Sequence, residues 1–169
     1  MNDSNKTKEQ LIQELEDLRR RNAKLEKSET ERKLVKEALQ ESEERYRTAI
    51  EQSNDGVVLV KEDRLFFVNQ KMVEIFGYDR PEEIIGLPIE MLIHPGDQER
   101  VKDLTRRRQQ GEAVPQKYEF KGCRKNGELI YIEVSATKIT FQGEALSLAY
   151  LGKVSESEAI RWMDIIHGK

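Results

Sequence analysis

The sequence predicts an α+β domain: a five-stranded antiparallel sheet with flanking helices, preceded by a long N-terminal helix. Two observations lead to this prediction. Residues 1–55 contain no glycine and no proline and are rich in charge, whereas residues 56–151 alternate short apolar runs with turn residues. In that second region the expected order is two strands, several short helices and three strands. Strands grouped in runs, with helices segregated between them, are typical of the α+β class.

The N-terminal helix has one narrow apolar stripe. Leu11, Leu15, Leu18, Asn22 and Leu25 recur at spacings of four and three, and the other positions are mostly charged. A stripe this narrow is typical of a coiled-coil seam rather than of a helix on a globular core. We therefore expect this helix to pair with a helix of another chain.

The flanking charges indicate which pairing is favoured. With the leucines of the stripe at a and d, the g and e positions give two attractive cross-pairs, Glu14 with Arg19 and Arg21 with Glu26. Asn22 at an a position favours two strands in register at some cost in stability. The prediction is a parallel homodimer; a single charged helix without a partner is the alternative.

The seam continues imperfectly toward the domain. Glu29 and Arg32 occupy the next a and d positions, and the apolar positions resume one residue early at Val35, which predicts local overwinding. We expect a signal from the domain to alter helix pairing at the weak patch formed by Glu29 and Arg32. The predicted dimer interface comprises Leu11, Leu15, Leu18, Asn22, Leu25, Leu39 and Tyr46.

Composition excludes several function classes. The formal net charge of −3 argues against a nucleic-acid surface, and the runs Arg19–Arg21 and Arg106–Arg108 are interpreted as solvated helix faces. Cys123 is the single cysteine, which rules out an internal disulfide and suits a reducing compartment. No apolar run approaches 18 residues, and a signal-peptide core is missing, so a cytoplasmic protein without membrane association is expected.

The first half of the domain begins with a hairpin. Val57–Val60 and Leu65–Val68 are β-rich runs around a charged turn. Asn69 is expected to cap a short helix that Gly77 ends. A helical turn then opens at Pro81, another covers Ile89–Ile93, and Asp97 is expected to cap a longer helix over about 98–110.

Three strands complete the domain. Tyr118 and Phe120 alternate with polar residues, and Asn126-Gly127 is a strong hairpin signal. Residues 130–136 alternate apolar and polar side chains, and Gln142-Gly143 then turns the chain into a last strand over Ala145–Leu151.

In combination these segments resemble the PAS family of sensor domains. The resemblance covers about residues 42–156 and is carried by SEERYRTAIEQSNDGVVLV, LFFVNQ, IFGYDRPEEIIG, IHPGDQERV and RKNGELIYIEV. It implies a five-stranded sheet whose flanking helices enclose a small cavity, and a domain that senses a ligand or mediates dimerisation. The expected boundaries are 1–45 for the coiled coil, 46–153 for the PAS-like domain and 154–169 for a C-terminal amphipathic helix or linker.

The cavity implied by the resemblance has candidate lining residues. Alternation and the resemblance together select Ile75, Phe76, Met91, Leu92, Tyr118, Phe120, Val134 and Leu148. So few polar candidates favour a small apolar or aromatic ligand. The alternative is that these side chains simply fill the core.

The end of the domain departs from the family pattern. Members often leave the last strand through an Asp-Ile-Thr segment that couples the sheet to an output helix. Here Lys153 stands in place of the acid and Ser155 in place of the threonine, and both are candidate signal-relay residues. Ser155 and Glu158 predict a capping box for a helix that carries Trp162 and Ile166.

Cofactors and catalysis find no support in the sequence. A flavin photosensor of this family needs a reactive cysteine, and the corresponding stretch Pro88–Gly96 has none. Haem would need an axial histidine, whereas His94 precedes Pro95 and is interpreted as a loop residue. No metal site and no catalytic motif is recognisable, so neither a cofactor nor enzyme activity is expected.

The predicted function is a cytoplasmic bacterial sensory module in signal transduction. It would sense a small ligand or mediate dimerisation, relay its state through the flanking helices, and act on a separate signalling protein such as a kinase or regulator. The alternative is a structural dimerisation or scaffold protein without a ligand.

Overall fold

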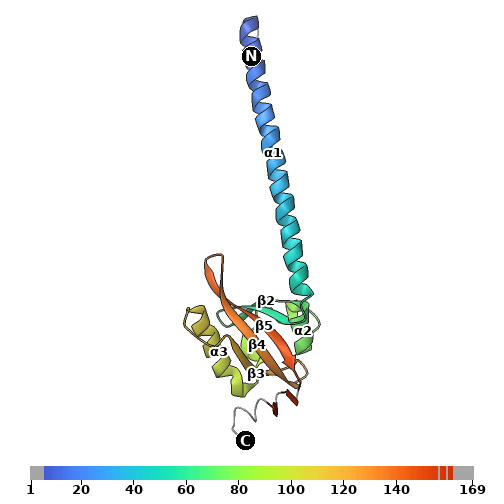
Figure 1. Ribbon diagram of the computed structural model, residues 1–169, viewed down its shortest axis with the longest axis vertical. Coiled ribbons are helices and arrows are strands. Elements are labelled where there is room, and N and C mark those ends of the chain that lie inside the picture. The colour runs from blue at the N-terminus through green and yellow to red at the C-terminus, as the bar shows by residue number, and fades with distance from the viewer. Residues whose placement is uncertain (1–5, 156, 159, 162–169) are drawn as a thin grey trace. The chain divides into compact units, whose positions relative to one another are not determined.

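The computed structural model describes residues 6–155, 157, 158, 160 and 161 (Figure 1). The chain divides into two units, Met1–Arg47 and Thr48–Lys169, and each is described by itself. Within the described residues, no helix is both long enough and apolar enough to cross a bilayer.

Helix α1, Lys8–Glu51, runs for 44 residues without interruption, through the weak patch at Glu29 and Arg32. None of its residues is buried, and the seam leucines are about half exposed, from 47% at Leu11 to 60% at Leu25. Its ion pairs within one chain, such as Arg45 with Glu41, lie on the solvated surface. The helix therefore leaves its entire apolar stripe uncovered within one chain.

The sheet has five strands in the order β2-β1-β5-β4-β3, and all neighbouring strands are antiparallel. The strands are β1 Gly56–Lys61, β2 Arg64–Val68, β3 Lys117–Cys123, β4 Leu129–Phe141 and β5 Glu144–Val154. Gln142 and Gly143 both have positive φ in the β4–β5 turn, as a tight hairpin requires. The predicted five-stranded antiparallel fold is confirmed.

Short helices connect β2 to β3. They are α2 Gln70–Phe76, the 3₁₀ turns η1 Pro81–Glu83 and η2 Ile89–Leu92, and α3 Pro95–Gln109. Asn69 caps α2, and Gly77 ends it in the left-handed conformation at φ 74°, both as predicted.

The predicted cap of α3 is wrong. The helix starts at Pro95, and His94 is its N-cap, with Nδ1 accepting a hydrogen bond from the Gly96 N–H at 3.1 Å. Proline suits the first helical position because its missing N–H would be unsatisfied there in any case. Asp97 lies within the first turn, and its carboxylate is engaged with β3 instead.

The core lies between one face of the sheet and these helices. Its largest fully buried side chains include Phe76, Met72, Ile84 and Ile132, each no more than 2% exposed. Residues directly opposite each other in the ladder share a face of the sheet. Val58 opposite Ala149 and Val60 opposite Ser147 therefore define the core face, whereas Leu59 opposite Leu148 defines the other face.

Candidate functional site: a small cavity with a buried arginine at its polar end

A cavity of about 50 Å³ lies between the sheet and helices α2, η2 and α3. Its walls are mostly aliphatic and aromatic. The lining residues are Val58, Val60, Leu65, Met72, Phe76, Ile89, Leu92, Ile93, Val101, Thr105, Tyr118, Phe120, Val134, Ser147, Ala149 and Leu151. The cavity is a third of the roughly 150 Å³ that holds benzene in a well-studied engineered cavity, so it suits a molecule of only a few heavy atoms.

Five of the eight predicted pocket residues line this cavity: Phe76, Leu92, Tyr118, Phe120 and Val134. They come from α2, η2, β3 and β4, and the fold brings them together on the core face.

The other three predicted pocket residues lie elsewhere. Met91 is 51% exposed on η2, and Ile75 is buried but lines a polar surface groove beside Arg124. Leu148 lies on the opposite face of the sheet, because in β5 the cavity side is formed by Ser147, Ala149 and Leu151. Small residues on that side leave room for the cavity, whereas the sequence pattern favoured the bulkier even-numbered side.

One end of the cavity is polar. Thr105 on α3, Tyr118 on β3 and Ser147 on β5 bring three hydroxyl groups to it. Behind them lies Arg108, which is 4% exposed. Its Nη1 donates to Ser147 Oγ at 3.4 Å and its Nη2 to the Pro115 carbonyl at 2.9 Å, and its guanidinium lies 5.6 Å from the centre of the Tyr118 ring.

The interpretation of Arg106–Arg108 as a wholly solvated run is therefore wrong at its last residue. Arg106 and Arg107 form surface ion pairs with Asp103, but Arg108 points inward. Its position could have been read from the spacing, since Val101, Thr105 and Arg108 recur at intervals of four and three and are all buried. An arginine on the apolar face of a helix is the signal that was missed.

Burial raises the pKa of Tyr118, although the charge of Arg108 and hydrogen bonds from Arg108 and Thr105 to the phenol oxygen act in the opposite direction. The phenol therefore stays protonated at neutral pH. A neutral Tyr118 presents an O–H group at the polar end.

Asn69 connects the cavity wall to the end of α1. This side chain is fully buried, and its Oδ1 accepts from the N–H groups of Val57 at 2.8 Å and Met72 at 2.9 Å. Its Nδ2 donates to the carbonyls of Ile50 at 2.8 Å and Asp55 at 3.2 Å. One amide thus ties the last turn of α1, strand β1 and the first turn of α2 together.

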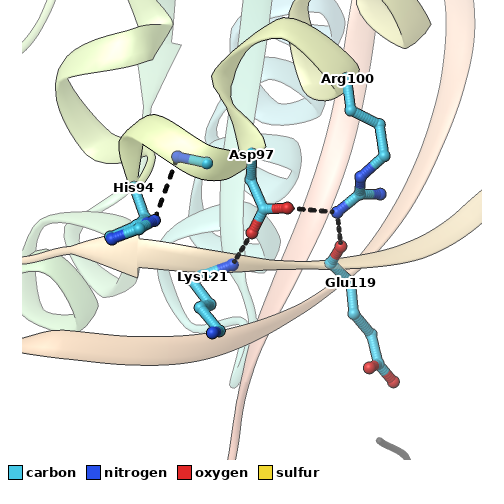
Figure 2. Close-up of polar contacts among 6 residues, drawn as sticks. His94, Asp97, Arg100, Glu119 and Lys121 are labelled. Carbon is cyan, nitrogen blue, oxygen red and sulfur yellow. Dashed lines mark hydrogen bonds and ion pairs between the residues drawn. The ribbon is translucent and has the colours of Figure 1, made fainter. Parts of the chain in front are cut away.

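A second group of polar contacts holds the start of α3 on β3 (Figure 2). Asp97 Oδ2 accepts from the Lys121 N–H at 2.8 Å, and its Oδ1 pairs with Arg100 Nη2 at 3.0 Å. The same Nη2 donates to the Glu119 carbonyl at 2.6 Å, and the His94 N–H donates to the Lys121 carbonyl at 2.8 Å. Burial raises the pKa of Asp97, but the hydrogen bonds from Lys121 and Arg100 outweigh it and leave the pKa below its usual value.

The candidate relay residues lie at the end of the last strand. Lys153 is in β5 and borders the same surface groove as Ile75 and Arg124. The Ser155 N–H donates to Glu158 Oε2 at 3.1 Å, and the Glu158 N–H donates to Ser155 Oγ at 3.3 Å, so the predicted capping box is formed. Trp162 and Ile166 lie outside the described residues.

Other candidate ligands are dispersed. Cys123 is partly buried in β3, and His94 serves as the helix cap. Within the described part of the chain, no three His, Cys, Asp or Glu residues are grouped so that they could hold a metal ion.

The family model of the PAS fold matches residues 44–152. The chain belongs to the PAS family. A PAS domain is a signal-sensing module found in sensor kinases, and such domains are generally not catalytic. The resemblance inferred from the sequence is confirmed.

Individual relatives agree with this assignment. The chain is 29% identical to sporulation kinase A of Bacillus subtilis over 130 residues, a match that covers 74% of this chain and 21% of the kinase. The chain thus spans about a fifth of the length of that relative. The PAS domain of an HTR-like protein from Haloarcula marismortui matches with a TM-score of 0.60 and 26% identity, over 72% of this chain and 99% of that one.

A more distant structure shows the same fold. The PAS domain of a protein from Colwellia psychrerythraea matches with a TM-score of 0.57 and 21% identity, over 67% of this chain and 97% of that one.

Proposed function

We propose that this chain is a non-catalytic sensory module of a parallel homodimer, in which a small ligand in the cavity changes how the two α1 helices pair. The proposed receiver is a separate signalling protein such as a kinase or regulator. A reducing location in the cytoplasm suits the single cysteine.

The buried Asn69 amide is the observation that supports this proposal most. Met72 and Phe76 of α2 line the cavity, and Asn69 bonds both the first turn of α2 and the Ile50 carbonyl in the last turn of α1. A ligand that displaces α2 would disturb a bond to the helix that continues into the seam. Such a shift requires that the ligand bind one arrangement better than the other.

The uncovered stripe of α1 supports the dimer. A helix with no buried residue gains little from its own packing, so its apolar side chains favour a partner. Asn22 and the two g–e pairs favour a second copy in parallel register.

The size of the cavity supports the expectation that neither haem nor flavin is bound. Pockets for drug-sized molecules measure roughly 300–1,000 Å³, several times the 50 Å³ found between the sheet and α3.

The test is disulfide cross-linking across the seam. Leu18→Cys in a Cys123→Ser background should cross-link rapidly in a parallel dimer, because d positions of the two helices face each other. A bound small molecule should change the cross-linking rate, and Asn69→Asp, which removes the donor to Ile50, should remove that change. Arg20→Cys, off the seam, should cross-link slowly. A monomer by sedimentation would overturn the homodimer.

A structural dimerisation or scaffold protein is the second candidate. The observation that favours it is exposed aromatic surface: Phe66, Phe141 and Tyr150 are each 44–45% exposed, and the rings of Phe66 and Phe141 lie 6.1 Å apart. Under this alternative, cross-linking would be fast but would not respond to any small molecule that binds.

A further inference from the structure

Arg108 is a buried cation with few partners. It is 4% exposed, and its contacts with the Pro115 carbonyl, the Ser147 hydroxyl and the Tyr118 ring are all with uncharged groups. No carboxylate among the described residues lies within ion-pair distance of it, whereas its neighbour Arg107 pairs with both Asp103 and Glu112. Buried charges are normally paired, because removing them from water is costly. The negative end of the α3 dipole offsets part of this charge, since Arg108 lies in the last turn.

The contacts of Arg108 direct hydrogen-bond donors toward the cavity. Arg108 donates to Ser147 Oγ, which leaves the Ser147 proton without an acceptor among the described residues. Tyr118 stays protonated, and its ring lies against the guanidinium. Both residues line the cavity, as does Thr105. The polar end therefore offers hydroxyl donors with a positive charge behind them, which is an arrangement complementary to an anion.

The rest of the cavity sets the shape of that anion. The remaining lining residues are apolar apart from the backbone, so a ligand with one charged end and a short hydrocarbon body matches both ends. A volume of about 50 Å³ excludes bodies as large as benzene. Acetate matches this volume best, and propionate, with one more methylene group, is the upper limit.

We infer that the cavity binds a small aliphatic monocarboxylate, with its carboxylate at Ser147, Tyr118 and Thr105 and the charge of Arg108 behind them. This inference rests on the proposed sensory function and specifies the chemical class of its ligand. It differs from the small apolar or aromatic ligand predicted from the sequence, because that prediction treated Arg108 as solvated.

The test compares propionate with propionamide on the full chain, in buffer free of chloride and acetate. Binding is followed by two-dimensional NMR shifts of the domain and by thermal stabilisation. Propionate should bind in the millimolar range and propionamide at least about tenfold more weakly, since hydrogen bonds to a charged group are the stronger ones.

Two substitutions locate the charge that matters. Arg108→Gln should weaken propionate about 10- to 100-fold. Arg107→Gln removes the same charge one residue away, on the surface, and should leave binding unchanged. Where Arg108→Gln fails to fold, Ser147→Ala takes its place: it keeps the bond from Arg108 to Pro115 and should still weaken propionate severalfold.

Three outcomes would overturn the inference. Equal binding of propionamide would show that the cavity does not distinguish a charged ligand from a neutral one. It would reject the anion-binding inference and leave the proposed sensory function intact. Chloride alone competing at the same site, with no gain from the propionate body, would make it an inorganic-anion site. No binding of propionate at all would also reject it. Conversely, Arg108-dependent binding with no change in Leu18→Cys cross-linking would uphold the ligand and reject the relay.

Discussion

Helix α1 exposes its apolar side chains, whereas the PAS domain buries a core of them. The domain buries most of its apolar side chains within one chain, with Val73, Phe76 and Ile132 at 0% exposure, whereas the α1 leucines are 47–60% exposed. Burial against the same chain gives stability that does not depend on concentration, while burial against a second chain gives stability that does. With α1 paired as proposed, the two regions should respond differently to mutation and to dilution, and this contrast can be tested in each region.

The largest effect is expected in the core. Phe76→Ala should cost about 3–5 kcal/mol, because it removes a buried ring and leaves a cavity between α2 and the sheet. Chemical denaturation followed by the near-ultraviolet signal of the domain measures it. Ile132→Val gives a graded control at about 1 kcal/mol.

The matched substitution in α1 should leave the domain unaffected. Leu18→Ala also truncates a large apolar side chain to a methyl group. Its effect should appear only in how the unfolding of the helix depends on protein concentration. A loss of domain stability in Leu18→Ala equal to that in Phe76→Ala would contradict the contrast between the two regions.

Asn69 links the core of the domain to the last turn of α1, because its side chain forms hydrogen bonds with both. Asn69→Ala should cost roughly 3 kcal/mol, since it leaves the buried N–H groups of Val57 and Met72 without acceptors. Asn69→Asp retains an acceptor for both but places a carboxylate oxygen against the carbonyls of Ile50 and Asp55 in a buried site, so it should cost at least as much. Hydrogen exchange at Ile50 and Glu51 should speed up in both variants. Unchanged exchange there would argue against a tether between Asn69 and α1.

The domain was the more predictable region because local patterns and the fold agree there. The hairpin at Asn126-Gly127, the Asn69 cap and the Gly77 stop each follow from short-range chemistry. The strand order β2-β1-β5-β4-β3 was not predicted from the sequence, because it depends on pairings between distant segments that the periodicity within one strand does not show.

The site was less predictable for two physical reasons. The face of β5 that lines the cavity carries its smaller residues, Ser147 and Ala149, so hydrophobicity pointed to Leu148 on the wrong face. Arg108 lay within a run of three arginines whose other members are solvated, and only the helical spacing from Val101 marks it as inward. Charge composition alone does not distinguish a solvated arginine from a buried one.

The proposed α1 seam should be stabilised by replacing its polar residue with an apolar one. Asn22→Leu replaces a polar a-position residue with an apolar one and should tighten association about tenfold, roughly 1.4 kcal/mol, while relaxing the choice of two strands. Sedimentation equilibrium measures both changes. Asn22→Ala serves as the control, because it removes the amide without adding much apolar surface. Weaker association of Asn22→Leu than of the natural chain would count against the assigned seam.

The smallest expected effect lies at the start of α3, where a single carboxylate holds the helix on β3. Because hydrogen bonds hold the pKa of Asp97 below its unfolded value of about 3.9, its contribution is present above that pH and is lost as the pH falls through the folded pKa. Asp97→Asn should therefore cost about 0.5–1 kcal/mol at pH 7, reduced by partial solvent exposure, and nothing at the acid end. Asp103→Asn, on the same helix but paired only with surface arginines, should cost less at every pH. Urea denaturation between pH 7 and the acid limit of folding distinguishes the two, since a loss for Asp97→Asn that grew as the pH fell would mean that the carboxylate is held in its protonated form.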